Sequence, residues 1–229
     1  MTSIEIPKGV TSIGLGAFEG CSSLGNIAVD VNNQTYLSID GILFNKDQTT
    51  LICYPAGKTE VAYTIPGGVT SIGGYALSYC SSLASIEIPS SVTSIGDQAF
   101  FGCSSLMSVE ISSSVTSIGW FAFQSCSDLA SITILSRDVE IDDSSYTLPT
   151  TATIYGYAGS TAQAYAEKYD RTFVILDEPI EPTESTEPTD TTEPGSEGGG
   201  SAVVWIIVAV VVVLAGIFIA VCVYQKKKK

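Results

Sequence analysis

Apolar positions recur along this chain in a unit of 23 residues. The unit follows the pattern I-x-I-P-x-x-V-T-S-I-G-x-x-A-F-x-x-C-S-S-L-x-S and begins at Ile4, Tyr63, Ile86 and Val109. In I-x-I, two apolar side chains flank one that faces outward, which is the alternation of a short strand with one buried face. Ala-Phe, Cys and Leu then follow at a spacing that favours a short helical turn. One coil cannot bury this apolar set alone. The pattern therefore predicts a solenoid of stacked coils, with a β-strand and a short helical turn in each.

A glycine closes the Thr-Ser-Ile-Gly segment of each unit, at Gly14, Gly73, Gly96 and Gly119. A glycine at a fixed repeat position indicates either a positive φ or a close approach of two backbones. Both explanations are compatible with the sequence.

The repeat is interrupted once, between Val29 and Ile65. These equivalent positions are 36 residues apart instead of 23, so 13 residues are inserted. Two alternating apolar segments, 36–39 and 41–44, flank an Asp-Gly pair, which is a signal for a tight turn. We expect residues 30–62 to form a hairpin-like insert or a widened coil within the array.

The repeat pattern fades after Ile141, and the segment that follows has the features of a C-terminal cap. Ser160 or Thr161 can start a short helix that runs through Lys168, and residues 173–175 can add a last strand. The chain is therefore expected to consist of seven segments in order: repeats (1–29), insert (30–62), repeats (63–141), cap (142–176), stalk (177–201), apolar segment (202–224) and basic tail (225–229).

The apolar segment 202–224 contains no charged residue. As a helix it would span roughly 35 Å, enough to cross a bilayer, so we predict one transmembrane helix; a buried core helix or strand is the alternative. Lysines follow directly in the tail 225–229. By the positive-inside rule the tail is expected in the cytoplasm and residues 1–201 outside, which predicts a single-pass protein of the plasma membrane and cell surface.

The stalk 177–201 is rich in Pro, Thr, Glu and Gly and lacks apolar periodicity, so it is expected to be disordered and to act as a spacer. The start of the chain shows neither a basic nor an apolar leader. We expect an N-terminal truncation; a start chosen inside a longer gene and a C-terminal helix acting as a late signal-anchor are the alternatives.

Charge and composition exclude several functions. The chain has 24 acidic and 10 basic residues, and four of the basic ones are the terminal lysines. A surface this acidic repels nucleic acid, so no nucleic-acid partner is expected. There is no histidine, the commonest general base and metal ligand. Glu140, Asp142 and Asp143 are interpreted as a solvated loop, since they match no ordered calcium-binding pattern. We predict no catalytic site, no metal and no cofactor, and therefore not an enzyme.

Four cysteines follow the repeat register, at positions 21, 80, 103 and 126. We predict that they are reduced and buried as packing residues, with a disulfide or metal role as the alternative. Asn33 stands in a lone N-Q-T glycosylation sequon, which only a eukaryotic secretory pathway would use.

The unit C-S-S-L-x-S-I-x-I-P-x-S-V-T-S-I-G-x-x-A-F resembles the BspA-like leucine-rich repeats of surface antigens, and residues 1–176 are covered by this resemblance. It implies a leucine-rich-repeat solenoid that binds host extracellular components or other microbes. The short basic tail after the apolar segment is similar in layout to the trichomonad members of the family.

Outward residues of the predicted strands form the expected ligand face. In register, the candidates are Glu87, Glu110, Thr133, Ser85 and Ser108. Glu87 and Glu110 would be close like charges, so the partner is expected to present Lys, Arg or a shared cation. We predict an adhesin for an extracellular protein or glycan ligand, such as host matrix or other microbes. The alternative is a structural or receptor-like surface antigen without adhesive activity.

Overall fold

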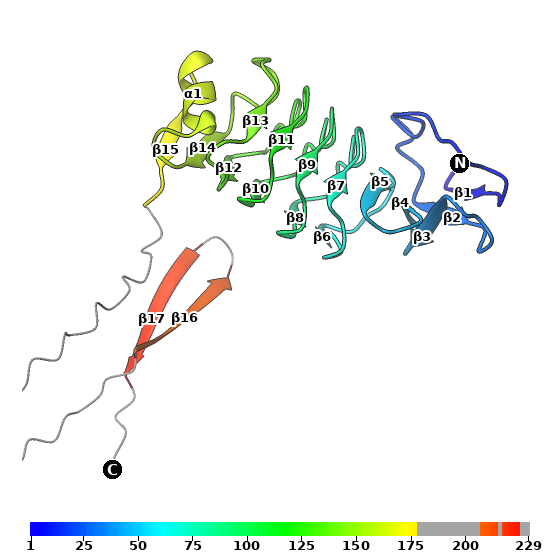
Figure 1. Ribbon diagram of the computed structural model, residues 1–229, viewed down its shortest axis with the longest axis horizontal. Coiled ribbons are helices and arrows are strands. Elements are labelled where there is room, and N and C mark those ends of the chain that lie inside the picture. Colours follow the sequence, from blue (N-terminus) through cyan, green and yellow to red (C-terminus); the bar gives the residue numbers. More distant parts are fainter. Residues whose placement is uncertain (178–206, 215–216, 225–229) are drawn as a thin grey trace, which may run out of the picture. The chain divides into compact units, whose positions relative to one another are not determined.

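The computed structural model describes residues 1–177, 207–214 and 217–224. It divides into two compact units, Met1–Ile180 and Glu181–Lys229. In the first unit the chain winds through successive coils, and strands of neighbouring coils lie side by side (Figure 1). The predicted solenoid is therefore confirmed.

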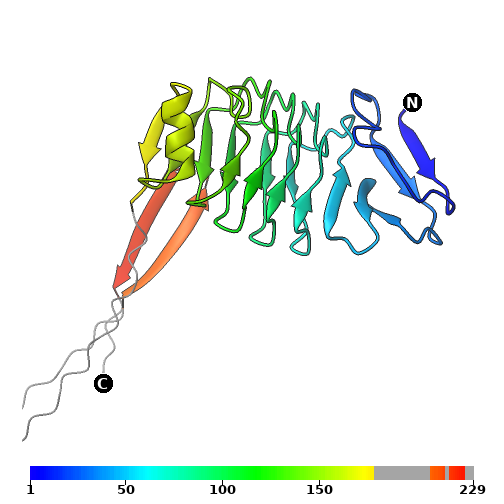
Figure 2. The same cartoon turned by 45° about the horizontal axis from the view of Figure 1, so that its top comes forward.

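From β6 onward, successive coils each contribute one strand to a six-stranded sheet, which we call the first sheet. Its strand order is β15-β14-β12-β10-β8-β6, and every pairing is parallel. Figure 2 shows these strands following one another along the array. Partners such as Val109 and Ile132 are one repeat apart, so the 23-residue period sets the register. The bounds are β6 (Ala62–Thr64), β8 (Ser85–Glu87), β10 (Ser108–Ile111), β12 (Ser131–Ile134), β14 (Thr153–Gly156) and β15 (Phe173–Ile175).

A second sheet, which the sequence pattern did not reveal, runs along another side of the coils. Its order is β13-β11-β9-β7-β5-β4-β3. In the regular repeats it uses only the Ser-Ile pair of Thr-Ser-Ile-Gly, and two residues are too few to show an alternation. The bounds are β3 (Tyr36–Ile39), β4 (Ile42–Asn45), β5 (Thr50–Cys53), β7 (Ser71–Ile72), β9 (Ser94–Ile95), β11 (Ser117–Ile118) and β13 (Glu140–Ile141).

The predicted helical turn of each coil is wrong. The Ala-Phe segment instead forms consecutive tight turns, as where Ala99 N–H donates to the Gly96 carbonyl at 3.2 Å and Phe101 N–H to the Gln98 carbonyl at 3.1 Å. Gln98 has φ 52°, and Tyr75 and Phe121, its equivalents in other coils, have φ 62° and 57°. A left-handed residue inside the segment prevents a right-handed helix from propagating.

Close packing of backbones explains the repeated glycine. A Cβ on Gly96 would lie 2.6 Å from the nitrogen of Gly74, and one on Gly119 would lie 2.6 Å from the nitrogen of Asp97. The φ angles of these repeat glycines are not positive. Of the two explanations the sequence allowed, the close approach is the one observed. Gly14 differs, because a Cβ there would meet nothing within 4 Å.

The core lies between the sheets and is continuous from coil to coil. Phe100 and Phe123 are fully buried, and their rings stack with centroids 4.9 Å apart and planes 6° apart. The thiols of Cys103 and Cys126 are also buried, and each donates to a carbonyl of the preceding coil at 3.1 Å. Burial as packing residues is thus confirmed for these cysteines and for Cys80.

The insert folds as the predicted hairpin. Strands β3 and β4 pair antiparallel, with Ile39 opposite Ile42. Between them, Asp40 has φ 51° and Gly41 has φ 78°. Positive φ at both central residues is the geometry of a tight hairpin turn, and an Asp-Gly pair favours it.

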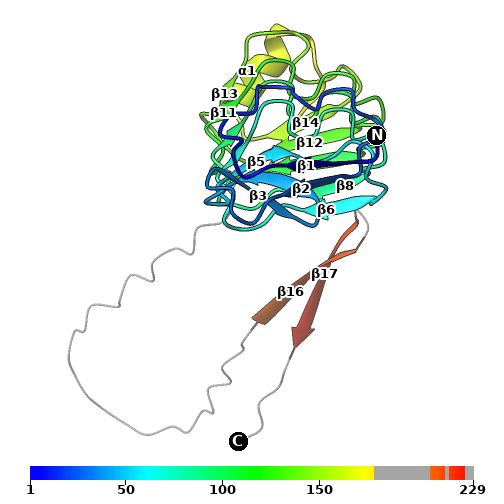
Figure 3. The same ribbon diagram turned by 90° about the vertical axis from the view of Figure 1, so that its right-hand side faces the viewer.

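The first coil packs separately from the others. Strands β1 (Ser3–Ile6) and β2 (Asn26–Val29) form their own two-stranded parallel sheet, seen at the front of the end-on view in Figure 3. Together with part of the insert they enclose a second apolar cluster. Cys21, in this coil, is only half-buried, so the predicted burial does not hold there.

The end of the array carries the predicted cap helix. Helix α1 (Thr161–Lys168) begins after Ser160, whose side chain accepts a hydrogen bond from Gln163 N–H. This N-cap satisfies a backbone donor that the first helical turn leaves free. Strand β15 follows and pairs with β14.

Asn33, the residue of the glycosylation sequon, is completely buried. Its side-chain nitrogen donates to the carbonyls of Pro7 at 2.9 Å and Val10 at 3.0 Å. That nitrogen is the attachment point of an N-linked glycan, which would replace one of its two hydrogens, so glycosylation would break at least one of these bonds and displace the first coil.

In the second unit, the prediction of a transmembrane helix over 202–224 is not met. The structure has two antiparallel strands there, β16 (Ile207–Leu214) and β17 (Ile217–Tyr224). Val and Ile favour strands, and an apolar run without polar alternation does not by itself distinguish helix from strand. Among the described residues, no helix is long and apolar enough to cross a membrane. The predicted stalk, apart from Asp177, and the tail 225–229 lie outside the described residues.

Candidate functional site

The predicted ligand residues lie together on the outward side of the first sheet, which we call the strand face. Ser85 pairs with Ser108, and Glu110 pairs with Thr133. Glu87 and Glu110 follow the two serines at the same offset, so they occupy facing positions on adjacent strands, about 4.8 Å apart in the pairing direction. Both glutamates are exposed, whereas Thr133 is half-buried.

A hydroxyl group on a neighbouring strand hydrogen-bonds to one carboxylate of this pair of like charges. The Thr64 hydroxyl, on the next strand, donates to the Glu87 carboxylate at 3.1 Å. The strand face therefore presents carboxylates and hydroxyls in parallel rows. Such rows can accept hydrogen bonds from cationic or hydroxyl-bearing groups of a ligand.

A separate concave feature lies on the second sheet, and we call it the acidic groove. It has a volume of about 440 Å³. Its floor includes Gly96 and Gly119, where the coils approach most closely. The polar and aromatic side chains that line it are Ser94, Asp97, Ser117, Trp120, Glu140 and Asp142.

Trp120 is the most conspicuous member of the acidic groove, since 43% of it is exposed. Its ring stacks on Phe121 with centroids 3.6 Å apart, and Phe121 in turn meets the edge of Tyr146 at 5.6 Å. The backbone N–H of Trp120 donates to Asp97 Oδ1 at 2.8 Å. These contacts fix both the indole and one carboxylate of the groove.

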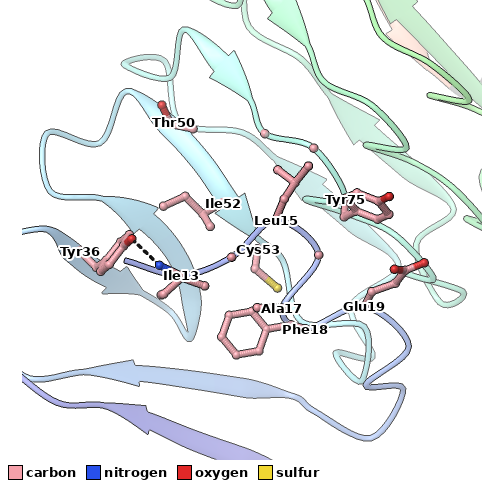
Figure 4. A pocket seen from close by; sticks show the side chains of 14 residues that line it. Ile13, Leu15, Ala17, Phe18, Glu19, Tyr36, Thr50, Ile52, Cys53 and Tyr75 are labelled. Atoms are coloured by element: carbon pink, nitrogen blue, oxygen red, sulfur yellow. Dashed lines mark hydrogen bonds between the residues drawn. The ribbon is translucent and has the colours of Figure 1, made fainter. Parts of the chain in front are cut away.

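A second hollow, the apolar cavity, adjoins the acidic groove, because Leu15 and Gly74 line both. It has a volume of about 230 Å³ and opens between the first coil and the insert. Figure 4 shows Phe18, Ile52 and Leu15 among its lining side chains.

The packing of the first coil produces this cavity. The Ile13 N–H donates to the Tyr36 hydroxyl at 2.9 Å, which ties the coil to the insert. Gly14 lacks the close backbone neighbours of the other repeat glycines, so the first coil is open to solvent or ligand at this position. Cys53 also lines the cavity, and burial raises the pKa of its thiol to about 12, so the group is neutral at physiological pH.

Among the described residues, no group of three or more Cys, Asp or Glu side chains is placed to hold a metal ion. Glu140 and Asp142 line the acidic groove, whereas the Asp143 carboxylate accepts hydrogen bonds from Lys168 and Tyr169. Two acids of this loop therefore line the groove, and the third contacts the C-terminal cap.

Comparison with known proteins fits the geometry of the array. The family profile described as "BspA type Leucine rich repeat region" matches residues 1–61 and 56–148, in six copies. The chain belongs to the BspA-type leucine-rich-repeat family. The solenoid of this family typically serves as a binding scaffold. Among curated proteins, none matches the sequence of this BspA-type chain.

Two solved structures resemble the BspA-type array. A leucine-rich repeat protein from Eubacterium ventriosum is 34% identical in sequence, with a TM-score of 0.63. The matched region covers 69% of the present chain and 43% of that protein. A leucine rich cell surface protein from Faecalibacterium prausnitzii is 30% identical in sequence, with a TM-score of 0.65. The matched region covers 79% of the present chain and 49% of that protein. The present chain thus spans less than half the length of either relative.

The BspA-type repeats differ from one another at positions that line the hollows, a signal that the repeat pattern alone does not show. The two residues after the Thr-Ser-Ile-Gly segment change from coil to coil, while the core positions around them repeat. These pairs are Leu15-Gly16, Gly74-Tyr75, Asp97-Gln98 and Trp120-Phe121. Packing constrains the repeated residues, so the varied pairs are where an individual surface can be built on a common scaffold.

Proposed function

We propose that this BspA-type chain is a cell-surface binding protein, an adhesin that displays its repeat array to extracellular protein or glycan ligands. The observation that carries the proposal is the strand face, where exposed glutamates and hydroxyl side chains occupy matching positions on adjacent strands. A rigid array of this kind presents many weak contacts at fixed spacing, which favours binding to an extended surface.

Display at the cell surface is part of this proposal. The similarity to a leucine rich cell surface protein supports it. Protease added to intact cells should remove the repeat array, residues 1–176. A protected repeat array would contradict surface display.

Binding can be tested with the double change Glu87→Gln and Glu110→Gln in the purified full chain. Immobilised host matrix, mucin and bacterial cells serve as ligands. We expect the affinity to fall by about 1 kcal/mol, roughly fivefold, and its salt dependence to weaken, because exposed charge pairs contribute about 0.5 kcal/mol each.

The matched control is Asp128→Asn with Glu167→Gln, which removes two exposed charges elsewhere on the array. Equal losses in both double variants would show general charge attraction and not a strand-face site. A wild-type chain that binds none of these ligands would support the alternative, a structural surface antigen without adhesive activity.

A further inference from the structure

We propose that the acidic groove and the apolar cavity together form a docking site for an extended peptide segment of a partner protein. The segment would carry an Arg or Lys that enters the acidic groove and a bulky apolar side chain that enters the apolar cavity. The inference rests on the proposed function in that the array binds partners, but it assigns a different surface and a definite ligand chemistry.

The groove is built to receive a positive charge. Asp97 and Glu140 are exposed and Asp142 is half-buried, and these three carboxylates line one concave space. An aromatic ring beside them adds to this attraction, because Trp is the best partner for a cation among the aromatic side chains. The chain as a whole is acidic, so its field also draws cationic segments toward the groove.

The aromatic platform is held in place before any ligand arrives. One face of the Trp120 ring lies against Phe121, which Tyr146 braces edge-on. The Trp120 backbone is tied to the carboxylate of Asp97. Side chains that are already ordered lose less entropy on binding, so these contacts increase the affinity available to a ligand.

The adjoining cavity distinguishes a peptide from a glycan. Most of its lining is hydrocarbon, from side chains such as Ile13, Leu15, Phe18 and Ile52. Its polar side chains are Glu19, Thr50, Tyr36 and Tyr75, and the two tyrosine hydroxyls already accept hydrogen bonds from Ile13 N–H and Gln98 Nε2. Such a lining suits an apolar side chain, whereas a sugar ring would leave its hydroxyls unpaired there. A volume of about 230 Å³ is enough for one large side chain. The observations therefore favour a peptide segment that combines a cation with an apolar anchor.

The two hollows also lie in a suitable order for one extended segment. Leu15 and Gly74 belong to both, so a ligand can pass from one hollow to the next across neighbouring coils. Gly96 and Gly119 contribute only backbone to the lining of this path. The varied repeat positions line this path, as expected if it sets specificity.

The test uses the purified full chain and fluorescein-labelled peptides in a Gly-Ser background. Each peptide carries one Arg and one Phe, separated by about two to five residues at roughly 3.3 Å per residue. Matched peptides replace Arg with Gln or Phe with Ser. Fluorescence anisotropy measures the affinity at low and at physiological salt.

We expect at least one Arg/Phe peptide to bind and both matched peptides to bind more weakly. Trp120→Ala should lower the affinity about fivefold to tenfold, and Glu140→Gln about threefold with a smaller salt dependence. The controls are Tyr79→Ala and Glu167→Gln. Tyr79 is a similarly exposed aromatic residue, and Glu167 is an exposed glutamate on helix α1, away from both hollows and from the strand face. Both control variants should leave peptide affinity within about twofold, and thermal unfolding checks that every variant is folded.

Three results would overturn this proposal. If no peptide of the series binds while matrix, mucin or cells still do, the docking site is wrong and the proposed function stands. Equal losses in the control variants would mean non-specific attraction to an acidic protein. If the Gln peptide binds as well as the Arg peptide, and Trp120→Ala abolishes salt-independent binding of neutral oligosaccharides, the groove is a glycan site instead.

Discussion

Replacing Phe100 with alanine tests the packing on which the whole array depends. The side chain is completely buried, and its ring stacks on Phe123 of the next coil. The backbone at this position also joins two coils, since Phe100 N–H donates to the Ala122 carbonyl at 2.8 Å. The substitution leaves that backbone bond available and removes the ring from the interface between coils.

The expected loss in the free energy of unfolding is about 3–5 kcal/mol, the usual cost of removing a buried aromatic ring. Of this, about 0.5–1.5 kcal/mol belongs to the stacked pair with Phe123, and the rest to lost burial and the cavity left behind. Globular proteins are stable by only about 5–15 kcal/mol, so the variant should lie near the limit of folding.

Urea unfolding followed by circular dichroism measures the effect. With a slope of about 1–3 kcal/mol per molar, the midpoint should fall by about 1–5 M. Phe101→Ala is the control, because Phe101 is only half-buried and meets Tyr79 edge-on at a ring distance of 5.3 Å. It should cost about 1 kcal/mol.

Because coils share their interfaces, amide exchange should also accelerate in the coils before and after the substituted one. The packing argument fails if Phe100→Ala costs less than about 1 kcal/mol, or no more than Phe101→Ala. Faster exchange confined to the substituted coil would contradict the coupling between coils.

Further changes probe other contacts. Gly119→Ala should destabilise by about 1–3 kcal/mol, since its Cβ would meet backbone atoms at 2.6–2.7 Å, whereas Gly14→Ala, with open space around it, should be close to neutral in the same melts. Hydrogen bonding to Lys168 lowers the pKa of Asp143, so this carboxylate stabilises the native state at pH values above its unfolded pKa, and the stabilisation is lost as the pH falls through the folded pKa. Asp143→Asn should therefore reduce the loss of stability at acid pH. An unchanged acid region of the stability–pH curve would exclude the Asp143–Lys168 pair as a contributor. Burial raises the pKa of the Cys53 thiol to about 12, so the contribution of the neutral thiol to stability is complete below the unfolded pKa near 8.5 and is lost as pH rises toward 12. Iodoacetamide at pH 9 should therefore modify Cys53 in urea and spare it in the native protein. Equal rates of modification would show that the native thiol is accessible.

Much of the array follows from the repeat period. Because the repeat is 23 residues long, each residue is expected to lie beside the residue 23 positions later, in the next coil. The observed strand pairs Val109–Ile132 and Tyr63–Ile86 have this spacing. The Asp40-Gly41 turn was predictable for a local reason, because few residue pairs accept positive φ at both positions. The N-cap at Ser160 was predictable for the same kind of reason.

The candidate site was predictable only in part. The five residues of the strand face could be placed together, because an I-x-I strand has one outward position and the period repeats it. Whether they bind a ligand is not contained in that geometry. The acidic groove was missed because Trp120 and Asp97 look like scattered surface residues until the second sheet brings them to one hollow.

The sequence by itself determined the solenoid, its register, the hairpin of the insert and the burial of Cys80, Cys103 and Cys126, because each depends on a fixed spacing or on a local backbone preference. The tertiary structure alone decided how the coils fit against one another. Two-residue strands, the left-handed turns and the backbone contacts at Gly96 and Gly119 exist only once neighbouring coils are stacked. The strands at 207–214 and 217–224 were likewise undecided by an apolar run. The hollows beside Leu15 have the same origin, since the space between two coils depends on how closely their backbones approach, which no single coil specifies.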